Sequence, residues 1–397
     1  MRILLANFSK MVDDTGGAAK VHCAFANEME RRGHIVAMMY CDDKVGKPFF
    51  KISKNIKVYN LQHLYGRNIL FPKWLKVKRE LIRAVSVRRG RAVNDEFIER
   101  YLTDTVQRAL AEFNPDIIIT WQPSASKTFL CDIQTGIPVI TMSHGDPEDY
   151  FRTYPQEELP AIGKSAVCQV LMPSFTRAIT SRYPDMRTEI IGNVVPQYEE
   201  QADLAKEKAI YKIIFVGRLV KNHKRPHLLI EAFAKLANEF PNWNVEIWGA
   251  EDKKNYTDSM KQLIKKENLQ DRIFLKGTTH NIAQVLQKGD LFVFPSAYEG
   301  FGLSIAEAMS MGLPVIGYKN CAAVNELIQD GVSGFLADDG VDSLADKMKV
   351  LMSDQLTRRT MGDAARNAMK QFKADHIWDK WSVLLNTVLA KKIKDNK

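Results

Sequence analysis

Short apolar runs of strand length alternate with longer amphipathic segments along almost the whole chain. In the first half the apolar runs lie at 2–8, 34–40, 56–61, 116–120, 137–144, 166–174 and 189–193. In the second half they lie at 211–217, 244–249, 272–277, 291–296 and 313–318. Helical patterns lie between them, notably at 17–32, 95–113 and 226–240. This alternation predicts parallel sheets with helices on both faces, which is the α/β class.

The pattern stops and restarts near the middle of the chain, at the polar and charged segment 195–209. A chain of 397 residues also exceeds the usual size of one hydrophobic core. We therefore expect two doubly wound, Rossmann-like domains, at 1–195 and 196–373, that face each other across a cleft. Ligand should bind in that cleft, at the carboxyl ends of the strands. Apolar residues at helical spacing predict a last helix at about 374–392.

Composition narrows the class of protein. No apolar run approaches the roughly 18 residues of a membrane span, and the N-terminal run at 2–8 does not resemble a signal peptide. The five cysteines have neither metal-ligand nor CxxC spacing, which is typical of a reducing compartment. We therefore expect a cytoplasmic protein with no catalytic metal.

Most of the formal net charge of +9 falls in one segment, because residues 67–91 contain nine Lys or Arg and one Glu. The apolar residues of this segment recur at helical spacing: Trp74, Val77, Leu81, Ile82 and Val85. The resulting basic helix, at 72–90, is open to several interpretations. It can pack on its own domain, meet anionic lipid or a phosphate-bearing acceptor, or meet nucleic acid. No nucleic-acid-binding motif supports the last, so we expect no nucleic-acid partner.

A glycine-bearing loop follows the run 291–296 and leads into a short apolar helix. Gly300 and Gly302 allow close approach of a phosphate, and the helix start offers free N–H groups and a positive dipole end. Glu299 lies in the loop, and Glu307 lies about one turn into the helix. A sugar nucleotide fits this order: sugar at Glu299, phosphates at the helix start, ribose hydroxyls on Glu307. The alternative is two ordinary glutamates on a helix end and a surface.

Other classes of site fit this sequence less well. Neither half has a GxGxxG after its first strand, which argues against a dinucleotide-dependent oxidoreductase. Glu299 and Glu307 belong to one loop and helix, so they cannot readily flank a glycosidic bond from both sides as the carboxylates of a hydrolase do.

The segment EGFGLSIAE at 299–307 matches the Glu-x7-Glu element of GT-B glycosyltransferases. Together with GRLVKNHKRPHLLIEAF at 217–233 and the GG-bearing first loop, it resembles the retaining, metal-independent glycosyltransferase family 4. The resemblance covers the whole chain and is strongest at 211–340. Three further segments are similar to members that build bacterial surface polysaccharides from UDP-sugars: 276–296, 312–320 and 325–336. The resemblance to this family also implies that the last helix packs on the first domain. The apolar spacing of that helix alone leaves open the alternative of a contact between two copies in a dimer.

By this resemblance, Arg218 and Lys224 bind the donor diphosphate. Both lie in the loop after the first strand of the second domain, where two cations can neutralise a leaving diphosphate. The loop is one residue longer than is usual in the family, so His223 or Lys221 can share the role. A solvated basic turn is the simpler alternative.

The resemblance implies further donor contacts in both domains. His144 ends the run 137–144, where a family histidine contacts the donor sugar, and a core or capping histidine is the alternative. Gly16 and Gly17 precede the first long helix, whose start can face phosphate, unless they form only a tight turn. Thr278 and Thr279 match a loop that contacts the base, or form a simple loop. The expected catalytic residues are His144, Glu299, Arg218 and Lys224. The expected donor-binding residues are Gly16, Gly17, Arg218, Lys224, Thr278, Thr279, Glu299, Gly300, Phe301, Gly302, Leu303, Ser304 and Glu307.

These expectations describe a retaining, metal-independent glycosyltransferase. It would move a hexose or N-acetylhexosamine from a UDP-sugar to a glycan or lipid-linked saccharide, in the synthesis of lipopolysaccharide, capsule or exopolysaccharide. The nucleotide sugar is a co-substrate, and no cofactor is expected. An anionic membrane surface, met through 67–91 on the inner face of the cytoplasmic membrane, is a candidate partner. The alternatives are a sugar-nucleotide epimerase of the same architecture and a non-catalytic, membrane-associated binding protein.

Overall fold

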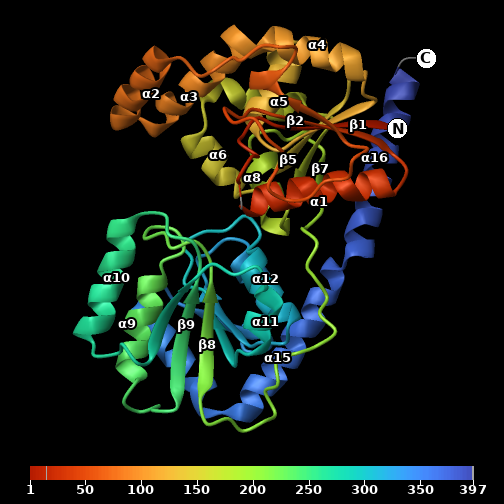
Figure 1. Ribbon diagram of the computed structural model, residues 1–397. Coiled ribbons are helices and arrows are strands. Elements are labelled where there is room, and N and C mark those ends of the chain that lie inside the picture. Colours follow the sequence, from red (N-terminus) through yellow and green to blue (C-terminus); the bar gives the residue numbers. More distant parts are fainter. Residues whose placement is uncertain (15, 396–397) are drawn as a thin grey trace. The chain divides into compact units, whose positions relative to one another are not determined.

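The structure, a computed structural model, describes residues 1–14 and 16–395 (Figure 1). The chain forms two compact units, of which the first is Met1–Gly192 with the chain from Trp378 onward, and the second is Asn193–Ile377. Each unit contains one parallel sheet, so the predicted class of two doubly wound α/β domains is confirmed. The units divide after Gly192 and Ile377, whereas the sequence prediction placed the divisions after residues 195 and 373.

The first unit has a seven-stranded parallel sheet in the order β3-β2-β1-β4-β5-β6-β7. Its strands are β1 (Arg2–Asn7), β2 (Ile35–Tyr40), β3 (Lys57–Asn60), β4 (Ile117–Thr120), β5 (Val139–Ser143), β6 (Val167–Val170) and β7 (Thr188–Ile190). Figure 1 shows α1 (Gly17–Arg31) on one face of the sheet and α4 (Thr103–Phe113) on the other. The strand order reverses between β1 and β4, and such a switch point opens a crevice at the carboxyl ends of the strands.

The helices over the predicted basic segment differ from the sequence prediction. One helix was expected at 72–90, but α2 (Lys73–Val85) and α3 (Val87–Phe97) are separate. Ser86 between them has an extended backbone, with φ −151° and ψ 114°, and its hydroxyl accepts a hydrogen bond from the N–H of Arg89. A serine at such a helix start competes with helix continuation by capping the next helix.

The helix predicted at 95–113 is also composite. It consists of the end of α3, a π-helical turn at Ile98–Leu102 and α4. The remaining α-helices within Met1–Gly192 are α5 (Pro123–Lys127), α6 (Pro147–Thr153), α7 (Pro160–Lys164) and α8 (Pro173–Thr180).

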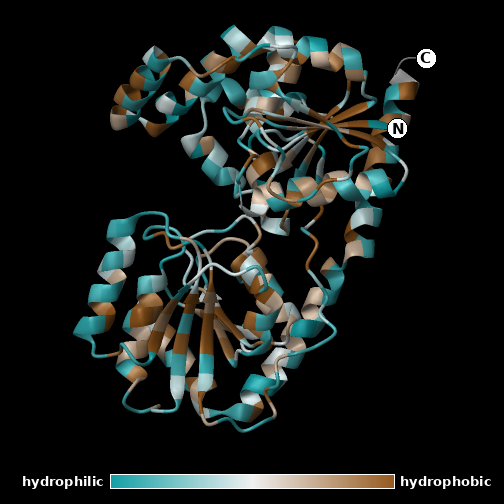
Figure 2. Ribbon diagram, viewed as in Figure 1, coloured by the Kyte–Doolittle hydropathy of each residue, from teal (hydrophilic) through white to brown (hydrophobic). Residues whose placement is uncertain are grey.

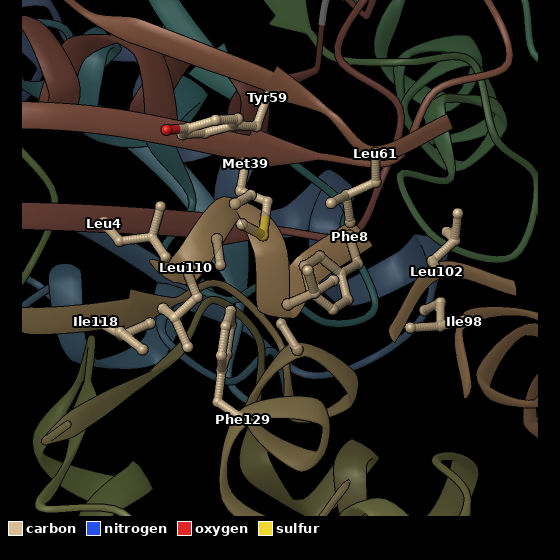
Figure 3. Packing of buried hydrophobic residues seen from close by; sticks show 14 of the residues in the cluster. Leu4, Phe8, Met39, Tyr59, Leu61, Ile98, Leu102, Leu110, Ile118 and Phe129 are labelled. Carbon is tan, nitrogen blue, oxygen red and sulfur yellow. The ribbon is translucent and has the colours of Figure 1, made fainter. Parts of the chain in front are cut away.

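The core of the first unit lies between the central strands and the helices that cover them. Leu4, Met39 and Ile118 project from β1, β2 and β4 and are fully buried, and Phe129 packs against them with its ring 6.0 Å from that of Phe8 (Figure 3). Strands covered on both faces become continuous apolar runs, which explains why the sequence pattern located them. Figure 2 shows the result as hydrophobic strands between helices of mixed character.

The last helix, α16 (Ala374–Asp395), packs on α1 through aromatic rings. The ring of Phe25 lies 5.5 Å from that of Trp378 and 4.8 Å from that of Trp381, both edge to face. At the end of α1, Arg32 forms an ion pair with Asp379 at 2.8 Å. Within residues 1–14 and 16–395, no helix combines the length and apolarity needed to cross a membrane.

The second unit has a six-stranded parallel sheet in the order β10-β9-β8-β11-β12-β13. Its strands are β8 (Tyr211–Val216), β9 (Trp243–Trp248), β10 (Ile273–Gly277), β11 (Leu291–Val293), β12 (Val315–Tyr318) and β13 (Gly334–Ala337). The helices are α9 (Pro226–Leu236), α10 (Lys254–Lys266), α11 (Ile282–Gln287), α12 (Leu303–Ser310), α13 (Val324–Leu327), α14 (Val341–Ser353) and α15 (Gln355–Met369). The sequence pattern missed β13, a four-residue edge strand that starts at a glycine. Here the switch point lies between β8 and β11.

Candidate functional site

The switch point of the second sheet brings two predicted loops together. The loop after β8 carries Arg218 and Lys224, and the loop after β11 carries Glu299. Backbone bonds hold the loops side by side, because the N–H of Ala297 donates to the carbonyl of His223 at 2.8 Å. Two segments about eighty positions apart in the chain therefore form one site, as the parallel topology requires.

The centre of this site is the carboxylate of Glu299, which is 8% exposed. Lys224 donates to its Oε1 atom in an ion pair whose two side chains are both largely buried. The hydroxyl of Ser296 donates to the same oxygen at 2.5 Å, and the Nε2 atom of His223 lies 3.6 Å from it. The second oxygen takes part in none of these three contacts.

Two opposing effects set the pKa of Glu299. Burial raises the pKa of a carboxyl, because it disfavours the charged form. The Lys224 ammonium and the hydrogen bonds from His223, Lys224 and Ser296 favour the carboxylate and prevail, so the pKa of Glu299 lies below its ordinary value. Glu299 is therefore an ionised acceptor at neutral pH.

The turn before α12 explains the glycine at position 302. Gly302 has φ +82°, a left-handed conformation that favours glycine, and a Cβ there would lie 3.1 Å from Cγ2 of Ile305. This turn starts α12, whose first N–H groups have no partner within the helix. The buried carboxylate of Glu307 follows one turn later on the same helix. Its charge and the burial of Tyr198 together raise the pKa of Tyr198, burial being the larger effect.

Other predicted donor residues take different positions in this unit. Arg218 lies just beyond β8 and is exposed, whereas the ring of Phe301 is buried, 5.1 Å from that of Phe372. Only the backbone of Phe301 can therefore reach a ligand. Thr278 is exposed after β10, and the Thr279 hydroxyl accepts from the N–H of Asn281 at 3.0 Å, in the turn that leads to α11.

Sequence reasoning missed the residue that fixes the geometry of the first loop, Arg225. It has φ +50°, and its guanidinium donates to the carbonyl of Pro295 at 2.9 Å and pairs with Asp339 at 2.9 Å. The ring of His223 also stacks on that of Tyr298, 4.2 Å apart and nearly parallel. No local pattern indicates either contact, since each joins residues about seventy or more positions apart.

The predicted residues of the first unit form a second group. His144 follows β5 and stacks on Trp121 at 5.4 Å, and Trp121 stacks on His22 of α1 at 4.1 Å. The Nε2 atom of His144 is buried without a hydrogen-bond partner. Burial lowers the pKa of His144 to about 4 and that of His22, which the sequence prediction missed, to about 3. Both rings are therefore neutral at pH 7.

The residue before α1 has its N–H bonded to a carboxylate of its own loop. The N–H of Gly16 donates to Oδ1 of Asp14 at 2.8 Å, and α1 begins at Gly17. A phosphate bound at this helix start would therefore share the N–H of Gly16 with Asp14. Among the described residues, no group of three or more His, Cys, Asp or Glu is arranged to hold a metal ion.

Comparison with known proteins gives the same class of enzyme as the sequence resemblance. Residues 196–368 match the family model of glycosyl transferases group 1. The poly(glycerol-phosphate) alpha-glucosyltransferase of Bacillus subtilis is 28% identical over 188 residues, which are 47% of this chain and 27% of that protein. The poly(ribitol-phosphate) alpha-N-acetylglucosaminyltransferase of Staphylococcus aureus is 29% identical over 199 residues, 50% of this chain and 39% of that protein. The chain thus spans less than half the length of these curated relatives.

Two solved structures share the fold over almost the full chain. Sucrose-phosphate synthase of Thermosynechococcus elongatus superimposes with a TM-score of 0.77 at 16% identity, covering 98% of this chain and 99% of that one. HepE of Anabaena, solved with UDP and glucose, gives a TM-score of 0.69 at 19% identity, covering 98% and 100%. These structures confirm the predicted GT-B fold. The glycosyltransferase class is confirmed by the family match of residues 196–368 and by the curated relatives.

Proposed function

Residues 196–368 form a glycosyl transferases group 1 domain, and from this premise we propose that the protein transfers a hexose or N-acetylhexosamine from a UDP-sugar to a glycan or lipid-linked saccharide. The transfer retains the anomeric configuration, needs no metal and serves the synthesis of a surface polysaccharide. The observation that carries this proposal is the buried, ionised Glu299 beside Lys224 and the start of α12.

The proposed donor lies along the turn and helix at 299–307. Its ribose hydroxyls donate to Glu307, its diphosphate accepts from the first N–H groups of α12 and from Arg218, and its sugar hydroxyls donate to Glu299. Thr278 and the backbone of Phe301 line the same carboxyl edge of the sheet. Gly300, Leu303 and Ser304 are proposed to contact the diphosphate.

The chemistry of the proposed step is mainly electrostatic. The bond between the sugar and the diphosphate breaks, and the acceptor oxygen attacks on the same face of the sugar. A phosphate oxygen of the leaving diphosphate takes the acceptor proton, so no protein nucleophile is required. Arg218, Lys224 and the start of α12 stabilise the negative charge that develops on the diphosphate. His144 and the α1 start at Gly16 and Gly17 are proposed as additional donor contacts.

Donor hydrolysis without acceptor tests this proposal. Full-length protein is incubated with UDP-glucose or UDP-N-acetylglucosamine, and the released sugar is followed by NMR. Retention predicts that the α-anomer appears first, and β-anomer first would contradict it. A changed sugar still attached to UDP would favour the epimerase. If UDP gives no thermal stabilisation while GDP or ADP does, the UDP assignment is wrong, since a ligand at 100 times its Kd adds about 2.7 kcal/mol of stability.

Peripheral membrane association is the second part of the proposal, and it rests on α2. The interpretation that its apolar residues pack on their own domain is wrong for four of the five, because they face solvent. The exposed fractions are 50% for Trp74, 60% for Val77, 69% for Leu81 and 88% for Val85. Only Leu75 of α2 is fully buried.

These four side chains form one stripe along α2, flanked by Lys73 and Lys78 at helical spacing. An apolar stripe bordered by cations suits the interface of an anionic membrane, here proposed as the inner face of the cytoplasmic membrane. Trp74→Ser with Leu81→Ser should reduce flotation with phosphatidylglycerol vesicles, while Leu356→Ser, which removes an equally exposed leucine of α15, should not. Equal flotation of both variants and wild type would contradict the proposal.

A further inference from the structure

A cavity of about 600 Å³ lies within the first unit, apart from the donor residues described above. It opens at the carboxyl ends of β1, β2 and β4, the crevice that the strand order of this sheet creates. The segments that follow these strands supply Lys10, Asp43 and Gln122, and α2 and α3 cover the opening with Lys76, Arg79 and Arg91. Its volume is in the range of sites for small ligands.

Four cations line this cavity, and two of them have no ion pair. Lys10 pairs with Asp43, and Arg79 pairs with Glu80 at 2.9 Å. Arg91 instead donates to the hydroxyl of Thr153 at 2.6 Å and lies with its guanidinium 4.7 Å from the ring centre of Tyr154. No carboxylate of the described residues lies within 4.0 Å of the Arg91 or Lys76 nitrogens.

Those contacts hold Arg91 in place without neutralising it. The hydroxyl of Thr153 and the ring of Tyr154 carry no charge, so they position the guanidinium without forming an ion pair. Its charge still acts on Glu158 at longer range and lowers the pKa of that carboxyl against the effect of burial. Lys76 is exposed on α2 and free to move toward the same ligand. Guanidinium and ammonium groups that lack a carboxylate partner are typical of phosphate sites.

Two carboxyl groups line the same cavity. Glu158 is 3% exposed and lies beside Asp95, and one oxygen of each is buried without a hydrogen-bond partner. Burial and the neighbouring Asp95 raise the pKa of Glu158, and burial raises that of Asp95. The pair therefore shares a proton at neutral pH in the hydrogen bond between the two groups, and its other oxygens can accept hydrogen bonds from ligand hydroxyls.

We propose that this cavity binds a phosphate ester that also carries free hydroxyl groups, and that this ester is part of the acceptor. Lys76 and Arg91, which form no ion pair within 4.0 Å among the described residues, bind the phosphate, and Asp95 with Glu158 binds the hydroxyls. The assignment of the ligand as acceptor rests on the proposed glycosyl transfer, whereas the binding site itself does not.

The orientation of α2 agrees with this assignment. Its apolar stripe faces solvent, while Lys76 and Arg79 line the cavity. One helix can therefore lie on a membrane and contact a phosphate ester at the same time. The ester belongs either to a lipid headgroup or to a water-soluble chain, and both present the same chemistry to the cavity.

Direct binding to full-length protein tests the site, with glucose 6-phosphate as the probe and glucose as its uncharged control. Saturating UDP is present so that the probe does not occupy the donor site. We expect the phosphate ester to bind at least about tenfold more tightly than glucose. Lys76→Gln and Arg91→Gln should each weaken the ester by about tenfold and leave glucose unchanged. Lys54→Gln, which removes an exposed cation outside the cavity, should change neither.

Lys76 makes no side-chain bond in the described structure, so its variant should fold even if Arg91→Gln is unstable. Glu158→Gln should weaken both probes, because both carry hydroxyls. Equal binding of glucose 6-phosphate to wild type, Lys76→Gln and Arg91→Gln would overturn the proposal, and so would a loss confined to Arg218→Gln. If phosphatidylglycerol vesicles displace the ester, the natural ligand is a lipid headgroup. If they do not displace it, the natural ligand is a water-soluble chain, and both results support the site. If the protein bound UDP but not the ester, this inference would be wrong and the proposed function would stand. If it bound the ester but not UDP, the proposed function would be wrong and the phosphate-ester site would stand.

Discussion

The ion pair between Lys224 and Glu299 permits a prediction with a calculable size. The variant Lys224→Met keeps the apolar length of the side chain and removes its charge. In the native protein the two side chains are only 13% and 9% exposed, so the variant leaves an almost buried carboxylate without its cation. Removing one partner of a buried pair destabilises a protein by about 3–5 kcal/mol. Ser296 and His223 still contact the carboxylate, so we expect the lower value.

The loss should depend on pH with a definite sign. In wild type the pKa of Glu299 is lower in the folded than in the unfolded chain, where it is about 4.3. The ion pair therefore stabilises the protein above this value, and the stabilisation is lost as the pH falls through the pKa of Glu299 in the folded chain. In Lys224→Met burial raises the pKa instead, and the variant regains stability as the carboxylate is protonated. The difference between the proteins should therefore be largest at pH 7 and shrink toward pH 4.

Differential scanning calorimetry measures this difference. A loss of about 3 kcal/mol corresponds to a fall in the Tm of the second unit of about 6–12 °C at pH 7. The double variant Lys224→Met with Glu299→Gln should recover most of it, because no buried charge remains. Lys235→Met breaks the exposed pair with Asp342 and should lower the Tm by a few degrees at most. An equal loss at pH 7 and pH 4, or no recovery in the double variant, would refute the reasoning.

Three further predictions concern the glycine turn, the ribose contact and the buried histidines. Gly302→Ala should lower the stability of the second unit by about 1–2 kcal/mol, measured by calorimetry. Gly331→Ala should lower it less, because Gly331 has a similar φ of +76° but its added Cβ would meet no atom within 4 Å. Glu307→Gln should abolish the preference for UDP over 2′-deoxy-UDP in a binding titration, and a persisting preference would disprove the ribose contact. The free energy of unfolding of the first unit should fall as the pH drops from 6.5 toward the lowered pKa values of His22 and His144. Each histidine should contribute a loss of about 1.4 kcal/mol per pH unit, because in this range only the unfolded chain takes up its proton. His22→Phe should flatten this dependence, and an unchanged slope would contradict it.

The sequence predicted those features that depend on local pattern. β1 and β4 are buried on both faces, so they read as apolar runs, whereas the edge strand β13 starts at Gly334 and has a partly exposed Phe335. The acid Glu299 could be identified because it begins the segment EGFGLSIAE, which matches the Glu-x7-Glu element. Its partnership with Lys224 inside the protein could not be read from the sequence, because the two residues are 75 positions apart.

The basic segment shows a second limit of pattern. Spacing predicted that Trp74, Leu81 and Val85 share one side of a helix, and they do. Spacing does not identify what covers that side, because a domain core and a membrane both select the same period. The structure shows that neither the unit's core nor a neighbouring helix covers it, as the exposure of Leu81 and Val85 demonstrates.

The charge of the Lys224–Glu299 pair leads to a final prediction about the proposed donor site. Because the two groups neutralise each other, the pair contributes no net charge to the binding of UDP, and the attraction for its diphosphate comes from Arg218 and the start of α12. Lys224 acts on the further charge that develops when the sugar leaves. Lys224→Met makes the pair position anionic, Glu299→Gln makes it cationic, and the double variant restores neutrality. UDP affinity, measured by calorimetry at low salt, should therefore be highest for Glu299→Gln, intermediate for wild type and the double variant, and lowest for Lys224→Met. If the double variant bound UDP as weakly as Lys224→Met, the lysine would act by direct contact with the phosphates, and net charge would not explain its role.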